Sequence, residues 1–274
     1  MTSSFRAVAP AGLAACLLAA LAACGGGGST SGTPTGAPVL NFVDPYPSDS
    51  TEDLAVLSLN TAGTPGTTVQ AGTFDQNSDE IQGTVLAGDT NSTLTFSDLN
   101  AGGEVEFSTP NGQSYSRVFD NTGNGGSALG VIGMVPRLAD MPGSNVVNYS
   151  GASVVTIADG TSVFDLAGTS SITADFGAGT VNVTLGNLDG IQQTPGNPDT
   201  NVNNVTTITI TGATIAGTGF SGGAITATNG VNTSGTQSHD GSFFGNGGVQ
   251  EAGGVLAVDG ASSDILGLYL ANRN

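Results

Sequence analysis

Alternation of apolar and polar residues with a period of two is the feature that most limits what this chain can fold into. From residue 147 onward, runs in which every second position is apolar or small are separated by Gly, Asn and Asp. A period of two places one set of side chains on one face of a strand, whereas a helix would need a period near 3.6. The pattern occurs in eight runs, at residues 147–157, 164–176, 181–185, 208–215, 219–228, 241–245, 253–260 and 264–273.

Eight consecutive strands joined by turns predict an all-β fold in which residues 145–274 form an eight-stranded antiparallel up-and-down β-barrel. A barrel of this size has an interior just wide enough to be filled by side chains. A β-sandwich is the alternative architecture. The alternation changes phase after Gly212, from Ile208 and Ile210 to Ala213 and Ile215, as a β-bulge would require.

Weaker runs of the same kind precede the barrel. They lie at residues 54–59, 81–86, 92–96, 114–119 and 129–135, with long polar stretches between them. Short strands separated by loops predict a small irregular β domain over residues 39–144.

The N-terminal residues resemble an export signal. Residues 1–23 carry one positive charge, at Arg6, followed by an uncharged apolar run that predicts a signal peptide. The run ends in Leu-Ala-Ala-Cys, which resembles the bacterial lipobox, so Cys24 is the predicted lipid attachment site. An ordinary signal peptide is the alternative. Residues 24–38 combine this cysteine with Gly, Ser, Thr and Pro, and they predict a flexible linker behind a lipid anchor.

The net charge of −18 narrows the range of partners. The chain has 22 acidic residues against four basic ones, and all four are arginines. Nucleic-acid binding needs a basic surface that displaces counterions from phosphates. We therefore expect no nucleic-acid partner.

Residues with catalytic or metal-binding potential are few, and we expect no enzymatic activity, no metal site and no resident cofactor. Residues 219–223 match the G-x-S-x-G pattern, but a nucleophile elbow joins a strand to a helix, and strands are predicted on both sides here. Residues 75–80 begin like a calcium loop but have Glu80 in place of the turn glycine. His239 is predicted to lie in a loop, either as a solvated residue or as a ligand-binding residue for haem.

The last strands contain a motif that supports a family assignment. Phe243, Phe244 and Gly245 are followed by Gln-Glu-Ala-Gly-Gly at residues 250–254 and by Gly-Leu-Tyr-Leu-Ala-Asn-Arg at residues 267–273. This order resembles the closing segment of the β-barrel domain in the transferrin-binding protein B family. The resemblance covers about residues 145–274, and its structural signature is Phe243, Phe244, Gly245, Glu251, Gly253 and Gly254.

The resemblance implies a surface lipoprotein whose barrel follows a small β "handle" domain. It implies an outer-membrane location, export by a Slam-type factor, a TonB-dependent receptor as a partner, and capture of haem or of an iron- or haem-carrying protein. A structural or adhesive surface lipoprotein with no role in iron uptake is the alternative. In a regular strand Phe243 and Phe244 point to opposite sides, one of them into the barrel, and Glu251 is expected to brace the hairpin by accepting backbone N–H bonds, with a ligand role as the alternative.

Overall fold

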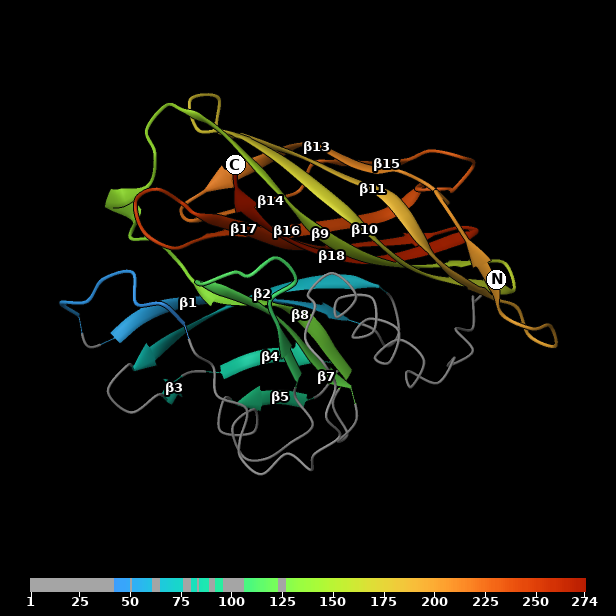
Figure 1. Ribbon diagram of the computed structural model, residues 1–274, viewed down its shortest axis with the longest axis horizontal. Helices are drawn as coiled ribbons and strands as arrows, with labels where there is room; N and C mark the ends of the chain where they lie inside the picture. Colours follow the sequence, from blue (N-terminus) through green and yellow to red (C-terminus); the bar gives the residue numbers. More distant parts are fainter. Residues whose placement is uncertain are drawn as a thin grey trace.

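The computed structural model describes residues 42–49, 51–60, 65–75, 80–82, 84–88, 92–95, 106–122 and 127–274. The predicted signal peptide, Cys24 and the linker to residue 38 lie outside these residues. The described chain is almost entirely β-structure (Figure 1). Its first eight strands are β1 (Thr51–Asn60), β2 (Gly66–Asp75), β3 (Glu80–Gln82), β4 (Thr84–Gly88), β5 (Ser92–Thr95), β6 (Glu106–Ser108), β7 (Ser116–Thr122) and β8 (Ser127–Met134).

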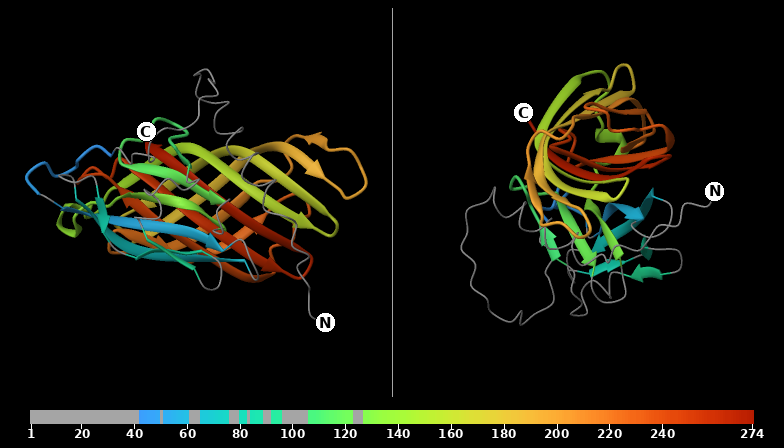
Figure 2. Two further views of the ribbon diagram at one scale, coloured as in Figure 1. Left: turned by 90° about the horizontal axis from the view of Figure 1, so that it is seen from below. Right: turned by 90° about the vertical axis from the view of Figure 1, so that its right-hand side faces the viewer.

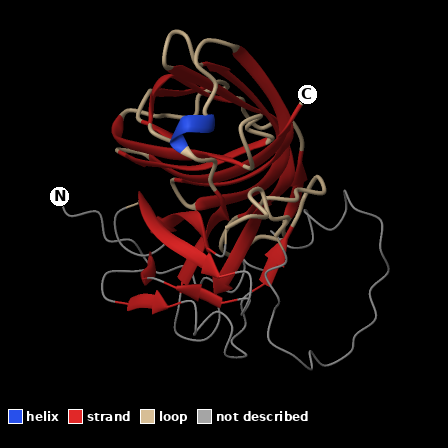
Figure 3. Ribbon diagram, turned by 90° about the vertical axis from the view of Figure 1, so that its left-hand side faces the viewer, coloured by secondary structure: helices blue, strands red, loops and turns tan. Residues whose placement is uncertain are grey.

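The remaining strands follow a 3-10 turn, η1 (Leu138–Asp140), the one helical element among the described residues (Figure 3). They are β9 (Val146–Asp159), β10 (Ser162–Asp175), β11 (Thr180–Gln193), β12 (Thr200–Val202), β13 (Ile208–Ala216), β14 (Gly219–Ser221), β15 (Ala224–Ala227), β16 (Gly235–Phe244), β17 (Glu251–Gly260) and β18 (Ser263–Arg273). In the part of the chain that is described, no helix has the length and apolar character needed to cross a membrane.

The predicted eight-stranded antiparallel barrel is confirmed. The ring runs β9-β10-β11-β13-β14-β16-β17-β18 and closes where β18 pairs with β9, from Ser263↔Asp159 to Arg273↔Tyr149. Figure 2 shows the closed ring along its axis in the right-hand view. Because every ring strand is paired on both sides, the barrel leaves no long open edge.

The inward side chains are the ones that the alternation selected. Tyr149, Ile157, Ile172, Val183 and Tyr269 belong to one buried cluster inside the barrel. The predicted bulge is present as well, since Val181 pairs with Ala213 while Val183 pairs with Ile210. Two residues of β13, 211 and 212, therefore lie opposite one residue of β11, and Gly212 takes a φ of 72° that suits glycine.

The fifth strand of the ring is split into β14 and β15. Gly222 and Gly223 have φ values of 72° and 89°, and they turn β15 away from the backbone of β16. Strands β15 and β16 do not pair through their backbones, and the side chain of Gln237 provides hydrogen bonds between them. Its Oε1 accepts from the N–H of Ile225 at 2.9 Å, and its Nε2 donates to the carbonyl of Ile225 at 2.8 Å. A side chain thus satisfies backbone groups that the ladder leaves unpaired.

The first eight strands form a six-stranded sheet in the order β3-β2-β1-β8-β7-β6, with β4 and β5 as a separate pair. Strand β2 was missed in the sequence because the run from Gly66 to Asp75 is mostly Thr, Gly and other polar residues. The sheet lies against the outer wall of the barrel (Figures 1 and 3). The buried cluster between them combines Leu57 and Val131 of the sheet with Phe244, Val255 and Leu268 of the barrel.

Candidate functional site at the junction of sheet and barrel

The two phenylalanines of β16 point to opposite sides of the barrel wall. Phe243 lies inside the barrel, where its ring centroid is 5.0 Å from those of Phe176 and Phe220 and 6.2 Å from that of Tyr149. Phe244 lies outside, in the cluster beneath the sheet. Both rings are fully buried. One dipeptide therefore contributes to two cores, because successive side chains of a strand alternate in direction.

Two glycines make room for Tyr269 and for the ring of Phe244. A Cβ atom on Gly254 would lie 2.4 Å from the Tyr269 hydroxyl oxygen and 2.7 Å from the Asp240 carbonyl oxygen. On the outer side, a Cβ on Gly133 of β8 would lie 2.5 Å from the ring of Phe244. These distances are below any real Cβ contact, so both sites require glycine for close packing.

Glu251 joins the barrel to the sheet domain. It is 4% exposed at the start of β17, and its carboxylate accepts from the backbone N–H of Ser114 at 2.6 Å and of Tyr115 at 3.1 Å. The hydroxyl of Ser116 donates to its other oxygen at 2.5 Å. Glu251 therefore accepts backbone N–H bonds as expected, but the donors belong to the segment leading into β7 and not to its own hairpin.

The surroundings of Glu251 both raise and lower its pKa. Burial raises the pKa of Glu251 above its ordinary value, while the donors from Ser116, Ser114 and Tyr115 and the charge of Arg117 oppose that rise. Short hydrogen bonds to a carboxylate are stronger than bonds between neutral groups. The arrangement holds the barrel and the sheet together, and a ligand role for Glu251 stays a prediction.

A second link joins the two domains farther along β16. Asp240 lies on the outer side of the barrel wall, and its carboxylate accepts a hydrogen bond from the hydroxyl of Thr67 on β2. The sequence carried no signal for this pair, because 173 positions separate the two residues. Together with Glu251, Asp240 adds polar contacts to the apolar cluster between the sheet and the barrel.

The expected loop position of His239 is wrong. His239 lies on β16, points into the barrel and is 2% exposed. Its Nδ1 lies 2.9 Å from the Gly222 carbonyl oxygen and its Nε2 lies 2.6 Å from the Tyr269 hydroxyl oxygen. The sequence pattern did not predict this strand, because inward positions are usually apolar. Here they are occupied by Gln237, His239 and Gly241.

These contacts determine the tautomer of His239. A carbonyl oxygen can only accept, so Nδ1 carries the proton and donates to Gly222, and Tyr269 donates to Nε2. Burial lowers the pKa of His239 below its ordinary value. Coordination of a haem iron would have to break one of these two hydrogen bonds, and the role of His239 in ligand binding stays a prediction. Among the described residues, no group of three or more His, Cys, Asp or Glu side chains could hold a metal ion.

The comparison with family models concerns the barrel. A family model described as the C-lobe and N-lobe beta barrels of Tf-binding protein B matches residues 141–273. No curated protein sequence matches the chain.

Several solved structures resemble the chain at low sequence identity. A transferrin-binding protein B double mutant from Haemophilus parasuis has 16% identity and a TM-score of 0.45, over 78% of this chain and 46% of that one. The isotype 1 protein from serogroup B Neisseria meningitidis has 16% identity and a TM-score of 0.44, over 81% and 43%. The N-lobe domain of lactoferrin-binding protein B from Moraxella bovis has 14% identity and a TM-score of 0.38, over 82% and 99%.

The chain spans 48% of the length of an intact structure, Ap-TbpB, that has both N and C lobes. The closed ring, the tandem phenylalanines and the matched residues concern the same part of the chain. Residues 141–273 therefore form a barrel that resembles the barrel lobes of the transferrin-binding protein B family.

Proposed function

We propose that this protein is an outer-membrane lipoprotein that captures an iron- or haem-carrying protein at the cell surface. The observation that carries the proposal is the match of residues 141–273 to a barrel family named for transferrin binding. The junction supports it, because Glu251, Asp240 and the apolar cluster between them hold the sheet and the barrel as one platform. A rigid platform binds a protein partner at a lower entropic cost than two loosely joined domains.

Two further observations indicate the chemistry of the partner. The net charge of −18 favours a partner with a basic surface, and complementary charge also speeds association. Direct capture of haem through His239 is less favoured than capture of a protein, because both ring nitrogens of His239 already have hydrogen-bond partners.

Binding to purified carriers tests the proposal. The lipoprotein in detergent is immobilised, and iron-loaded transferrin, lactoferrin and haemoglobin are passed over it at two salt concentrations. We expect saturable binding of one carrier that weakens as salt rises. Absence of binding to every carrier would favour the structural or adhesive alternative. A haem absorbance band that the wild type shows and the His239→Ala variant lacks would favour direct haem capture.

The location is tested separately. The Cys24→Ala variant is expected to leave the membrane fraction, and protease added to intact cells is expected to degrade the wild type if it is displayed outside. Deletion of a Slam-type export factor would then retain the protein inside the cell. Capture by a TonB-dependent receptor is tested by co-purification with the ligand-loaded lipoprotein.

A further inference from the structure

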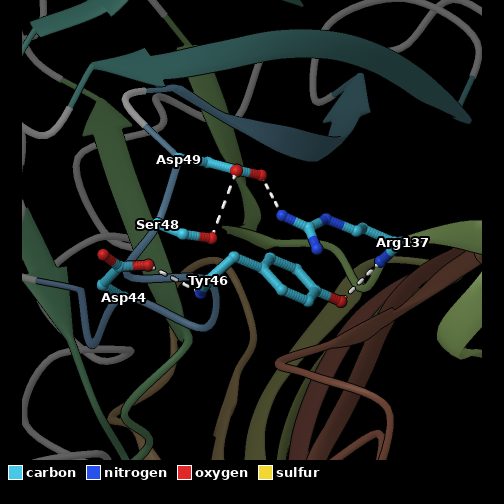
Figure 4. Close-up of polar contacts among 5 residues, drawn as sticks. All are labelled: Asp44, Tyr46, Ser48, Asp49 and Arg137. Carbon is cyan, nitrogen blue, oxygen red and sulfur yellow. Dashed lines mark hydrogen bonds and ion pairs between the residues drawn. The ribbon is translucent and has the colours of Figure 1, made fainter.

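Residues 42–49, which we call the strap, bind the connector between β8 and β9 (Figure 4). The backbone N–H of Arg137 donates to the Tyr46 hydroxyl at 2.6 Å, and the guanidinium carbon lies 4.0 Å from the centroid of the Tyr46 ring. The same guanidinium forms an ion pair with Asp49. Tyr46 is 8% exposed, so its ring is enclosed by the strap and the connector together.

The strap also binds the segment that Glu251 holds. The N–H of Val43 donates to the carbonyl of Ser114 at 3.0 Å, and the guanidinium carbon of Arg117 lies 5.2 Å from the centroid of the Phe42 ring. Ser114 in turn donates its own N–H to Glu251. The strap thus binds the junction of sheet and barrel at two places.

A buried carboxyl group lies next to the strap. Glu52, at the start of β1, is 4% exposed, and its Oε1 has no hydrogen-bond partner. The charged groups that act on it are Asp44 and Asp49 of the strap, Asp53 of its own strand and Arg137 of the connector. Three of these four groups are acidic, and the one cation is already paired with Asp49. A further acidic group, Asp140, interacts with Tyr46.

We propose that ionisation of Glu52 loosens the strap, so that residues 42–49 are bound to the junction more tightly in slightly acidic medium than in alkaline medium. A neutral Glu52 carboxyl adds no repulsion to Asp44 and Asp49. An ionised one adds a charge that is poorly solvated, lacks a donor at Oε1 and faces two like charges on the strap.

Glu52 changes its charge within the physiological pH range. Burial, followed by the charges of Asp44 and Asp49, raises the pKa of Glu52 to about 7. Release of the strap relieves part of this penalty, so loosening becomes more favourable as Glu52 ionises. Eight released residues would add roughly 26–29 Å of fully extended chain. The resulting gain in reach from a membrane rests on the proposed anchor at Cys24, whereas the release itself does not.

Hydrogen exchange of the strap in the full chain tests the proposal. Protection of residues 42–49 is measured at about pH 6 and about pH 8 and corrected for the intrinsic exchange rate at each pH. If the pKa of Glu52 returns from about 7 to the ordinary 4.5 on release, protection falls about tenfold between these two conditions. Equal protection at both would overturn the proposal.

Variants separate ionisation from a general loss of structure. Glu52→Gln cannot ionise, so its strap protection should be high and the same at both pH values, whereas Asp53→Asn, an exposed neighbour on the same strand, should keep the wild-type pH dependence. Tyr46→Phe removes the acceptor for Arg137 and should lower protection at both pH values. A pH dependence that survives in Glu52→Gln contradicts the proposal. If that variant does not fold, the pKa of Glu52 is measured in the wild type by NMR titration of its carboxyl group. A pKa near 4.5 would reject the proposal.

Discussion

Replacing Glu251 by Ala should weaken the junction of sheet and barrel more than any other single carboxylate substitution in the barrel. The variant leaves three donors without their acceptor, namely the N–H groups of Ser114 and Tyr115 and the hydroxyl of Ser116. Ser116 is fully buried, so its hydroxyl is the donor that bulk water reaches least easily. Ser114 and Tyr115 are half-buried, so water can reach them and offset part of the loss.

The magnitude follows from these contacts. A hydrogen bond to a charged group contributes about 1.5–3 kcal/mol, and an orphaned buried donor costs about 1–3 kcal/mol. Because the three bonds share one carboxylate, their contributions do not add, and we expect a total loss of about 3–5 kcal/mol. For a domain of this size that corresponds to a fall in Tm of roughly 6–20 °C. The Tm of Glu251→Gln should lie between the Tm of the wild type and that of Glu251→Ala. This variant keeps one acceptor oxygen but places an amide group among donors.

Thermal unfolding followed by circular dichroism measures the effect, and limited proteolysis reports where the structure opens. Cleavage should appear first in the segment leading into β7, near Ser114. Asp199→Ala is the matched control, since Asp199 is an exposed carboxylate and its loss should change stability by less than about 0.5 kcal/mol. A Tm of Glu251→Ala within about 2 °C of the wild-type value would refute the role assigned to the hydrogen bonds of Glu251.

Other predictions concern the barrel interior and its outer wall. Because burial lowers the pKa of His239 below 6.5, stability should decline as the pH falls from about 6.5, and a urea titration should show that His239→Gln lacks this decline. Gly254→Ala should lower the free energy of unfolding by about 1–3 kcal/mol, because its Cβ atom would clash with the Tyr269 hydroxyl. Adding Tyr269→Phe should recover part of that loss. Gly66→Ala is the control and should unfold like wild type, because its Cβ atom would have nothing within 4 Å. Phe244→Ala should cost about 3–5 kcal/mol and speed proteolysis of the sheet before that of the barrel, and simultaneous digestion of both would count against the junction described here.

The sequence by itself determined the strands of the barrel, whereas the choice between a barrel and a β-sandwich was settled by the pairing of β18 with β9. Alternation along most of the runs indicates which side chains face inward, and short turns between the runs leave antiparallel neighbours as the simplest pairing. The bulge after Gly212 and the opposite directions of Phe243 and Phe244 followed from the same period of two. These features are local, so they can be read from neighbouring residues alone.

Only the tertiary structure decided how the signature residues are used. Glu251 meets donors that lie 135 to 137 positions earlier in the chain, and no local pattern indicates which distant segment will supply them. His239 was misplaced for a related reason, since its inward position is satisfied by Gly222 and Tyr269 instead of by apolar contacts. Alternation reports direction along one strand, whereas the partner of a buried polar group depends on how separate strands and sheets come together.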